Sequence, residues 1–289
     1  MKIGLHISDF TWPEGAPRLG PVLADIASSA DEAGFERISV MDHVWQIGVI
    51  GPPEHEMLEA YTALGFLAAH TKQAKLLTLV TGVVYREPGL LVKAVTTLDA
   101  LSGGRAVLGI GAAWNEAEAR GLGLFFPPVK ERFERLEEAL QICKQMFAGD
   151  ETPYHGKHYR LERPLNSPLP LSRPVPILVG GGGEKKTLRL VARYADGCNL
   201  FPGPEVQHKL DVLKRHCEEL GRDYDAIEKT VTMRFDLGDK GERVGETIED
   251  LRRLHDLGFT VGHGGLRKAW DTKQFEIFQK EIIPAAEAL

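Results

Sequence analysis

Short apolar runs alternate with amphipathic segments along the whole chain. Several of the runs are nearly continuous in apolar residues, as expected for parallel strands that are covered on both faces. The runs begin at Lys2, Arg37, Leu76, Arg105, Pro176, Gly197, Thr230 and Phe259. This pattern predicts eight buried strands.

A helical segment follows each predicted strand. The clearest one has apolar residues at steps of three and four, with charge on the other face; these residues are Phe133, Leu136, Leu140, Cys143 and Phe147. The other helices are predicted near 21–34, 58–70, 90–101, 185–194, 205–220, 247–257 and 272–287. Glycines stand where helices would end, at Gly34, Gly149, Gly221 and Gly258.

Strict alternation of eight strands and eight helices predicts a (β/α)8 TIM barrel, an α/β fold, in a single domain over residues 1–289. A doubly wound open sheet is the alternative, and this number of β–α units makes it less favoured. Residues 150–173 are rich in Pro, Tyr and His. They predict an inserted loop or hairpin between the fourth helix and the fifth strand.

The composition, 43% hydrophobic and 26% charged, is that of a globular protein. A net charge of -6 argues against nucleic acid or an anionic membrane as a partner. The longest stretch without a charged residue, Ala60–Thr71, is too short to cross a bilayer. The first residues contain no apolar region of signal-peptide length, so we expect a cytoplasmic protein. The three cysteines lack metal-ligand spacing, and no metal site is expected.

In a TIM barrel the active site lies at the C-terminal ends of the strands. The candidates there are Ser8, Asp9, Asp42, His43, Trp45, Thr81, Gly82, Gly111, Ala112, Trp114, Asn115, Asn199 and His263. Asp42 and His43 form the sharpest titratable pair, because histidine gives or takes a proton near neutral pH. The alternative is that Asp42 caps a turn and His43 is an ordinary loop residue. The small residues Gly111 and Ala112 would let a planar ligand lie against the backbone.

Four consecutive glycines, Gly180 to Gly183, join the fifth predicted strand to its helix. Bare amides and the positive end of a helix dipole would meet there, which suits a phosphate. The spacing fits neither a Rossmann fingerprint nor a P-loop. A tight turn with close helix packing is the alternative. In the insertion, His155, His158 and Tyr159 would either cover a substrate or lie in a solvated loop.

Four features of the sequence together resemble the bacterial luciferase-like family, and within it the coenzyme F420-dependent oxidoreductases. They are GRAVLGIGAAWNEAE, PILVGGGGEKKTLRLVARYADGCNLF, YREPGLLVKAVTTLDALSGGR and the Asp42–His43 pair. The likeness covers essentially the whole chain. It implies a TIM barrel that holds a flavin-like ring in its mouth, with the cofactor phosphate on Gly181, Gly182 and Gly183.

The resemblance also implies particular site residues. A non-proline cis peptide between Leu79 and Val80 would buttress the ring, with Thr81, Gly111, Ala112 and Asn115 also binding the cofactor. His43 would move the proton of the substrate, and Asp42 would position that proton or a substrate group.

We therefore expect F420-dependent hydride transfer to or from a small organic substrate. An FMN-dependent monooxygenase that uses O2 is the alternative, and a flavin-binding protein without turnover is a third hypothesis. The longer acidic tail of F420 favours basic residues near the mouth, for which Lys185, Lys186, Arg189 and Arg193 are candidates. Homodimers are common in this family, and Ile47–Pro53 is a candidate for an interface or for a cover over the site.

Overall fold

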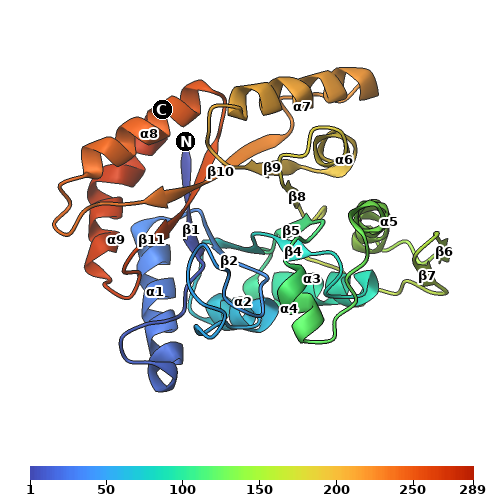
Figure 1. Ribbon diagram of the computed structural model, residues 1–289, viewed down its shortest axis with the longest axis horizontal. Helices are drawn as coiled ribbons and strands as arrows, with labels where there is room; N and C mark the ends of the chain where they lie inside the picture. Colours follow the sequence, from blue (N-terminus) through green and yellow to red (C-terminus); the bar gives the residue numbers. More distant parts are fainter.

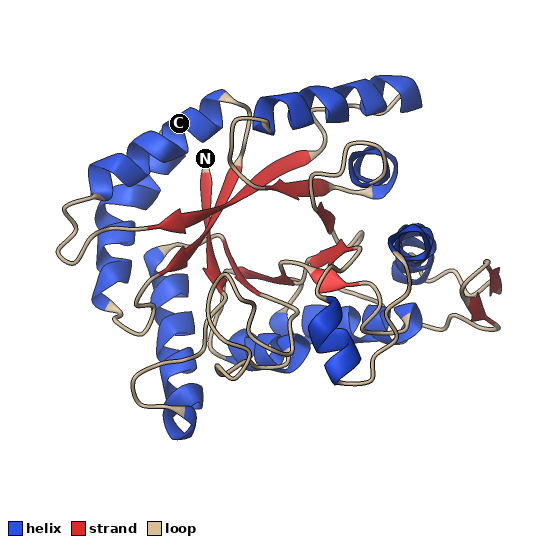
Figure 2. Ribbon diagram, in the orientation of Figure 1, coloured by secondary structure: helices blue, strands red, loops and turns tan.

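The apolar runs form parallel strands that pair into one sheet (Figures 1 and 2). The structure is a computed structural model that describes residues 1–289. Its strands are β1 (Lys2–Ile7), β2 (Arg37–Val40), β3 (Lys75–Thr78), β4 (Thr81–Gly82), β5 (Leu108–Gly111), β8 (Ile177–Gly180), β9 (Gly197–Leu200), β10 (Glu228–Phe235) and β11 (Val261–Leu266). They follow the order β3-β2-β1-β11-β10-β9-β8-β5-β4.

The two edges of this sheet meet and close it. Strand β3 corresponds to the predicted third strand, and β4 continues in the same direction beyond a cis peptide between Leu79 and Val80. Leu76 of β3 forms a parallel bridge with Ala106, just ahead of β5, and the Val107 amide donates to the Leu76 carbonyl at 3.0 Å. The TIM-barrel prediction is therefore confirmed, and an open doubly wound sheet is ruled out.

Helices surround the barrel as the periodicity predicts (Figure 2). They are α1 (Leu19–Ala33), α2 (Ala60–Ala69), α3 (Pro88–Ser102), α4 (Glu116–Gly121), α5 (Val129–Phe147), α6 (Thr187–Tyr194), α7 (Val206–Leu220), α8 (Val244–Asp256), α9 (Lys273–Ile277) and α10 (Ile283–Glu287), with a 3-10 turn at Ala16–Arg18 and a π-helical turn at Phe278–Ile282. Gly34 and Gly221 end their helices in the left-handed conformation, as expected. The short α4 was not predicted. No helix has the combination of length and apolarity needed to span a membrane.

The insertion contains a two-stranded hairpin, β6 (Tyr154–His155) with β7 (Arg160–Leu161). Helix α5 anchors it, since Glu138 accepts the amides of Lys157 at 2.8 Å and Tyr159 at 3.1 Å. His158 Nε2 lies 2.8 Å from the Glu134 carboxylate. Figure 1 places the hairpin on the outer side of α5, away from the barrel centre. These residues are thus tied to the outer surface of the barrel and not to its strand ends.

Two glycines at the C-terminal ends of neighbouring strands leave room for the side chain of Val80. A Cβ on Gly180 would lie 2.8 Å from Val80 Cγ1, and one on Gly111 would lie 2.9 Å from Val80 Cγ2. Neither position has room for a larger residue. Val80 and Leu79 also pack against a small buried cluster, which consists of Leu77, Val107 and Leu178.

A buried carboxylate on α1 fixes the start of β3. Asp31 is 7% exposed and accepts the amides of Lys72 at 2.8 Å, Gln73 at 3.0 Å and Ala74 at 2.7 Å. Asp31→Ala would leave these donors without an acceptor, so we expect a loss of unfolding free energy of about 2–3 kcal/mol. Urea denaturation of the variant measures this loss. Asp25→Ala is the matched control, because Asp25 is exposed on the same helix; equal stability of the two variants would contradict the assignment.

Candidate functional site

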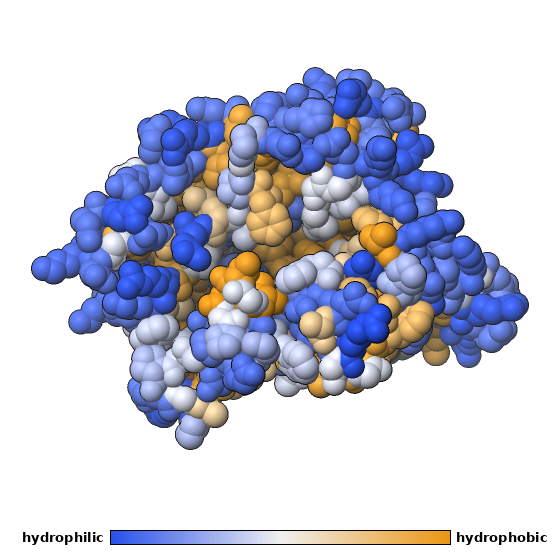
Figure 3. Space-filling model, in the orientation of Figure 1, coloured by the Kyte–Doolittle hydropathy of each residue, from blue (hydrophilic) through white to orange (hydrophobic).

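The face that carries α4 and the loop after β2 is hollowed at its centre (Figure 3). Apolar side chains gather in the hollow, and hydrophilic ones surround it. The loops that follow the strands meet around this hollow, as the barrel topology requires. The predicted candidates Asp42 and His43, the Leu79–Val80 bond, Gly111 and the glycine turn all lie at these strand ends.

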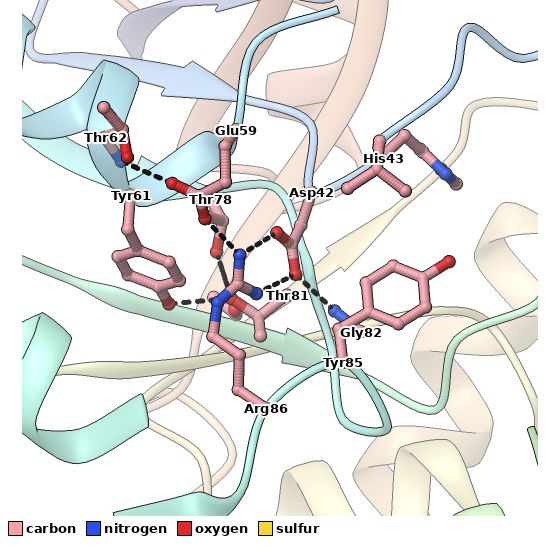
Figure 4. Close-up of polar contacts among 12 residues, drawn as sticks. Asp42, His43, Glu59, Tyr61, Thr62, Thr78, Thr81, Gly82, Tyr85 and Arg86 are labelled. Atoms are coloured by element: carbon pink, nitrogen blue, oxygen red, sulfur yellow. Dashed lines mark hydrogen bonds and ion pairs between the residues drawn. The ribbon is translucent and has the colours of Figure 1, made fainter. Parts of the chain in front are cut away.

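Asp42 is buried in a tight set of polar contacts (Figure 4). Arg86 binds it through two bonds, from Nη1 to Oδ2 at 2.7 Å and from Nη2 to Oδ1 at 2.9 Å. The Gly82 amide donates to Oδ2 at 3.0 Å. Arg86 also donates to Glu59, which caps the start of α2 by accepting the Thr62 amide. Both oxygens of Asp42 are therefore engaged within the protein.

His43 points away from Asp42 (Figure 4) and belongs to a second network. Its Nδ1 lies 2.5 Å from Oε1 of Glu118, a residue of α4. The His43 side chain is 15% exposed, whereas that of Glu118 is completely buried. The Trp114 ring meets His43 edge-on with a centroid separation of 5.4 Å. His43 is thus held on one side and open on the other, and its Nε2 makes no hydrogen bond within the protein.

Glu118 joins three segments of the chain. Its Oε2 accepts the amides of Val44 at 3.0 Å and Trp45 at 3.2 Å, and its Oε1 also accepts the Tyr85 hydroxyl at 2.5 Å. Burial alone would raise the pKa of Glu118, but the hydrogen bonds from His43 and Tyr85 outweigh it and hold that pKa below the ordinary value. Burial and the bond to Glu118 raise the pKa of Tyr85. Glu118 is therefore ionised at neutral pH, and Tyr85 keeps its proton.

Two other histidines point into the barrel and are less suited to proton transfer. His6 contacts the Ser39 hydroxyl at 2.9 Å, and burial, with a smaller contribution from His43, lowers its pKa to about 4. His263 is fully buried, and burial together with the charge of Arg37 lowers its pKa well below the usual value. Arg37 itself is buried and donates a hydrogen bond to the carboxylate of Glu228. Among these three histidines, His43 is the most exposed, with 15% of its side chain accessible, against 9% of the whole residue for His6 and 0% for His263.

Trp45 packs against the backbone of α4, since a Cβ on Gly121 would overlap its ring. Asn199 is buried and bonded to Thr230 and Thr232 on the neighbouring strand. Both residues therefore have a structural explanation. Asn115 is half-buried at the start of α4, where its side chain makes no capping hydrogen bond.

The cis peptide between Leu79 and Val80 is present, as the family resemblance implied. Hydroxyl groups flank it: Thr78 and Thr81 lie 2.6 Å apart, and Tyr61 reaches Thr81 at 2.8 Å. Beside β4, just after the end of the paired strand β5, Ala113 has a positive φ of 59°, the left-handed region that residues with side chains seldom adopt. The small residues predicted beside a planar ligand, Gly111–Ala113, thus lie at the C-terminal end of β5.

The four glycines of the turn, Gly180 to Gly183, differ in why the protein needs glycine at each position. Gly180 is needed beside Val80, and Gly181 has a positive φ of 117°. A Cβ on Gly183 would lie 2.8 Å from the Thr187 hydroxyl. At Gly182 the nearest atoms to a Cβ are 3.8 Å away, so protein packing does not require glycine there. The amides of Gly182 and Gly183 donate to no acceptor in the protein, which fits a site for an anionic group.

The four basic residues expected near this turn divide into two pairs. Arg189 is bound to Glu219 and Arg193 to Glu137, so both are directed to the outer surface. Lys186 lies over the Phe133 ring, and Lys185 is exposed without an ion-pair partner. Lys209 of α7 was not predicted. Its Cε lies 3.9 Å from the Cβ position of Gly182, and its Nζ is 2.5 Å from Glu184.

Sequence reasoning also missed Glu118, Tyr85, Arg86 and two arginines at the last two strands, Arg234 within β10 and Arg267 after β11. Arg234 is exposed on the same face of β10 as Thr230 and Thr232, and register pairs it with Gly265. Arg267 follows β11 and lines a small cavity with His6 and Ser8. Neither arginine makes an ion pair. The glutamates in WNEAE, directly after the fourth predicted strand, were the one signal for Glu118.

Comparisons with known proteins identify the family of this chain. A sequence model described as luciferase-like monooxygenase matches residues 7–279. An F420-dependent glucose-6-phosphate dehydrogenase of Nakamurella multipartita is 31% identical over 252 residues, covering 84% of this chain and 71% of that protein.

Solved structures share the fold at low sequence identity. An F420-dependent secondary alcohol dehydrogenase in complex with an F420-acetone adduct has a TM-score of 0.81 at 17% identity, covering 99% of this chain and 98% of that one. The monooxygenase RslO1 from Streptomyces bottropensis has a TM-score of 0.77 at 18% identity, covering 98% and 99%. The chain therefore belongs to the luciferase-like monooxygenase family, as its sequence motifs indicated, and relatives such as the Nakamurella protein are named as F420-dependent enzymes.

Proposed function

We propose that this protein is an F420-dependent oxidoreductase that catalyses hydride transfer to or from a small organic substrate, with His43 moving the accompanying proton. The observation that carries the proposal is the position of His43. It stands at a strand end in the open mouth, bound through Nδ1 to a buried carboxylate and free at Nε2. The names of the curated relatives support the choice of cofactor.

The residues around the mouth fit an F420 molecule. Leu79 and Val80, with Gly111 and Ala112 of the adjacent strand end, would offer the ring small or apolar surfaces. Thr81 and Asn115 lie at the same strand ends. The unpaired amides at Gly182 and Gly183 would bind the phosphate. Bound F420 supplies a ring carbon that gives or accepts a hydride, while the protein orients the substrate and handles the proton.

Asp42 is proposed to act through the backbone. Its contacts with Arg86 and Gly82 fix the end of β4 next to the cis peptide. With both of its oxygens bonded, Asp42 would position the ring site, and the transferred proton would be left to His43.

The substrate is proposed to carry an anionic group. Arg234 stands near the end of β10 and Arg267 follows β11, at the last two strands of the barrel, where TIM barrels often bind phosphate. Neither arginine makes an ion pair with a carboxylate. Several curated relatives are named for glucose 6-phosphate, a phosphorylated sugar. A phosphate or carboxylate held by these arginines would place the rest of the substrate over the centre of the mouth.

Calorimetric titration with oxidised F420 and, separately, with FMN tests the choice of cofactor. We expect at least about tenfold tighter binding of F420, a difference of about 1.4 kcal/mol, because its acidic tail can reach Lys185 and Lys186. Tighter binding of FMN would contradict the proposal. It would favour the second hypothesis, an O2-using monooxygenase, which oxygen consumption would then test.

Gly182→Val is expected to weaken F420 binding about tenfold or more, because the side chain would occupy the space next to the unpaired amides. The fold should be retained, since the Cβ position is open and φ is not in the left-handed region. Gly203→Val is the control, as Gly203 is a loop glycine with no atom near its Cβ position. Equal affinity of the two variants in the same titration would place the phosphate elsewhere.

Arg234→Met should raise KM for glucose 6-phosphate about 10- to 100-fold with little change in kcat, because it removes a charge-assisted hydrogen bond. Steady-state rates of F420 reduction measure this. The variant should leave the KM of a neutral alcohol such as 2-propanol unchanged. A wild-type preference for the neutral alcohol, or an unchanged KM for the sugar phosphate, would rule out the anion site.

A further inference from the structure

We infer that Glu118 is the positioning residue of the site: it holds His43 as the Nδ1–H tautomer and leaves the lone pair of Nε2 facing the mouth. This inference deepens the proposed function and rests on it for the identity of the reaction. The tautomer, in contrast, is a property of the protein alone and can be measured without cofactor or substrate.

The contacts of Glu118 leave it only one role toward His43. Two backbone amides, Val44 and Trp45, fill one oxygen, and the Tyr85 hydroxyl shares the other with His43. An ionised carboxylate can only accept hydrogen bonds. The hydrogen between Nδ1 and Oε1 therefore belongs to His43.

Two contacts hold the ring of His43 in its present orientation. Its Nδ1 is bonded to a side chain that is itself completely buried, and Trp114 packs edge-on against the ring at 5.4 Å. A 180° flip of the ring would place the Cδ2–H carbon where Nδ1 now lies, and the buried carboxylate of Glu118 would lose this hydrogen bond. Neutral His43 thus presents an acceptor to the mouth, the form that a general base requires.

The chemistry follows from this orientation. In the oxidative direction the O–H bond of a substrate alcohol breaks and its proton passes to Nε2 of His43. Bound F420 would accept the hydrogen of the same carbon together with the electron pair of the C–H bond, as a hydride, while the C=O bond forms. The resulting imidazolium is stabilised by the negative charge of Glu118. In the reductive direction the same Nε2 returns the proton to the carbonyl oxygen.

Neither of the two neighbouring carboxylates, Asp42 and Glu116, can take the place of Glu118 as the acceptor for Nδ1 of His43. Asp42 is bound to Arg86 and Gly82 and faces away from His43 (Figure 4). Glu116, two residues before Glu118 on α4, is exposed and paired with Arg120 at 2.7 Å. Glu116 is therefore a matched control on the same short helix.

The decisive variant is Glu118→Gln, which keeps the size of the side chain. The glutamine oxygen can still accept from Val44 and Trp45, and its amide would then donate to His43 Nδ1. This arrangement forces the hydrogen onto Nε2 and removes the acceptor from the mouth. Two-bond 15N–1H spectra of protein with 15N-labelled histidine, recorded in alkaline solution, report the tautomer. The His43 signal is assigned by its absence in His43→Ala.

We expect the Nδ1–H form in the wild type and in Glu116→Gln, and the Nε2–H form in Glu118→Gln. With F420 and glucose 6-phosphate, Glu118→Gln should lower kcat about 10²-fold or more while the dissociation constant of F420 stays within about threefold. Tyr85→Phe, which removes one donor to Glu118 but keeps the pair with His43, should lower kcat by less than about tenfold.

A double variant separates positioning from a merely structural role. If Glu118 acts through His43, then Glu118→Gln should cause no further loss of kcat in a His43→Ala background. Rate losses that multiply, or an unchanged tautomer in Glu118→Gln, would overturn the inference. Absence of F420-dependent turnover by the wild type would instead overturn the proposed function, and the spectra would still decide the tautomer.

Discussion

A carboxylate can be buried only if its charge and lone pairs are matched by partners, and this constraint organises the mouth of the barrel. Asp42 and Glu118 have side chains that are 1% and 0% exposed. Asp42 is matched by Arg86 and an amide of β4, and Glu118 by two loop amides, a tyrosine and His43. Because Asp42 and His43 are neighbours in the chain and point in opposite directions, the end of β2 is fixed by both networks at once.

The space and the backbone conformation at each glycine are the second constraint. They distinguish glycines that look alike in sequence. Gly111 and Gly180 are required because Val80, directly after the cis peptide, fills the space between their strands. Gly181 is required by its backbone conformation. Gly182 is required by neither, which is why we propose a ligand at this position. A run of four glycines thus combines packing, turn geometry and a candidate binding position.

Much of this architecture could be predicted because it rests on local patterns. Continuous apolar runs indicate parallel strands, and the glycines at 34 and 221 end helices by a conformation that few other residues adopt. The partners of the site residues could not be predicted in the same way. Glu118 lies 75 residues from His43, and Arg86 lies 44 residues from Asp42. Helix α4, which carries Glu118, spans only six residues and is too short to show a period.

The net charge of the chain is a poor guide to the charge of its mouth. The total is -6, yet many acidic side chains are neutralised where they lie, as Glu137 and Glu219 are by Arg193 and Arg189. Arg234, Arg267 and Lys185 remain without a carboxylate partner at the ends of strands that surround the hollow. A concave surface with low-dielectric walls concentrates the field of such charges. An acidic protein can therefore attract anions to one face, and in the proposed arrangement the separation between the β8 end and the β10–β11 ends would keep the cofactor phosphate and the anionic group of the substrate apart.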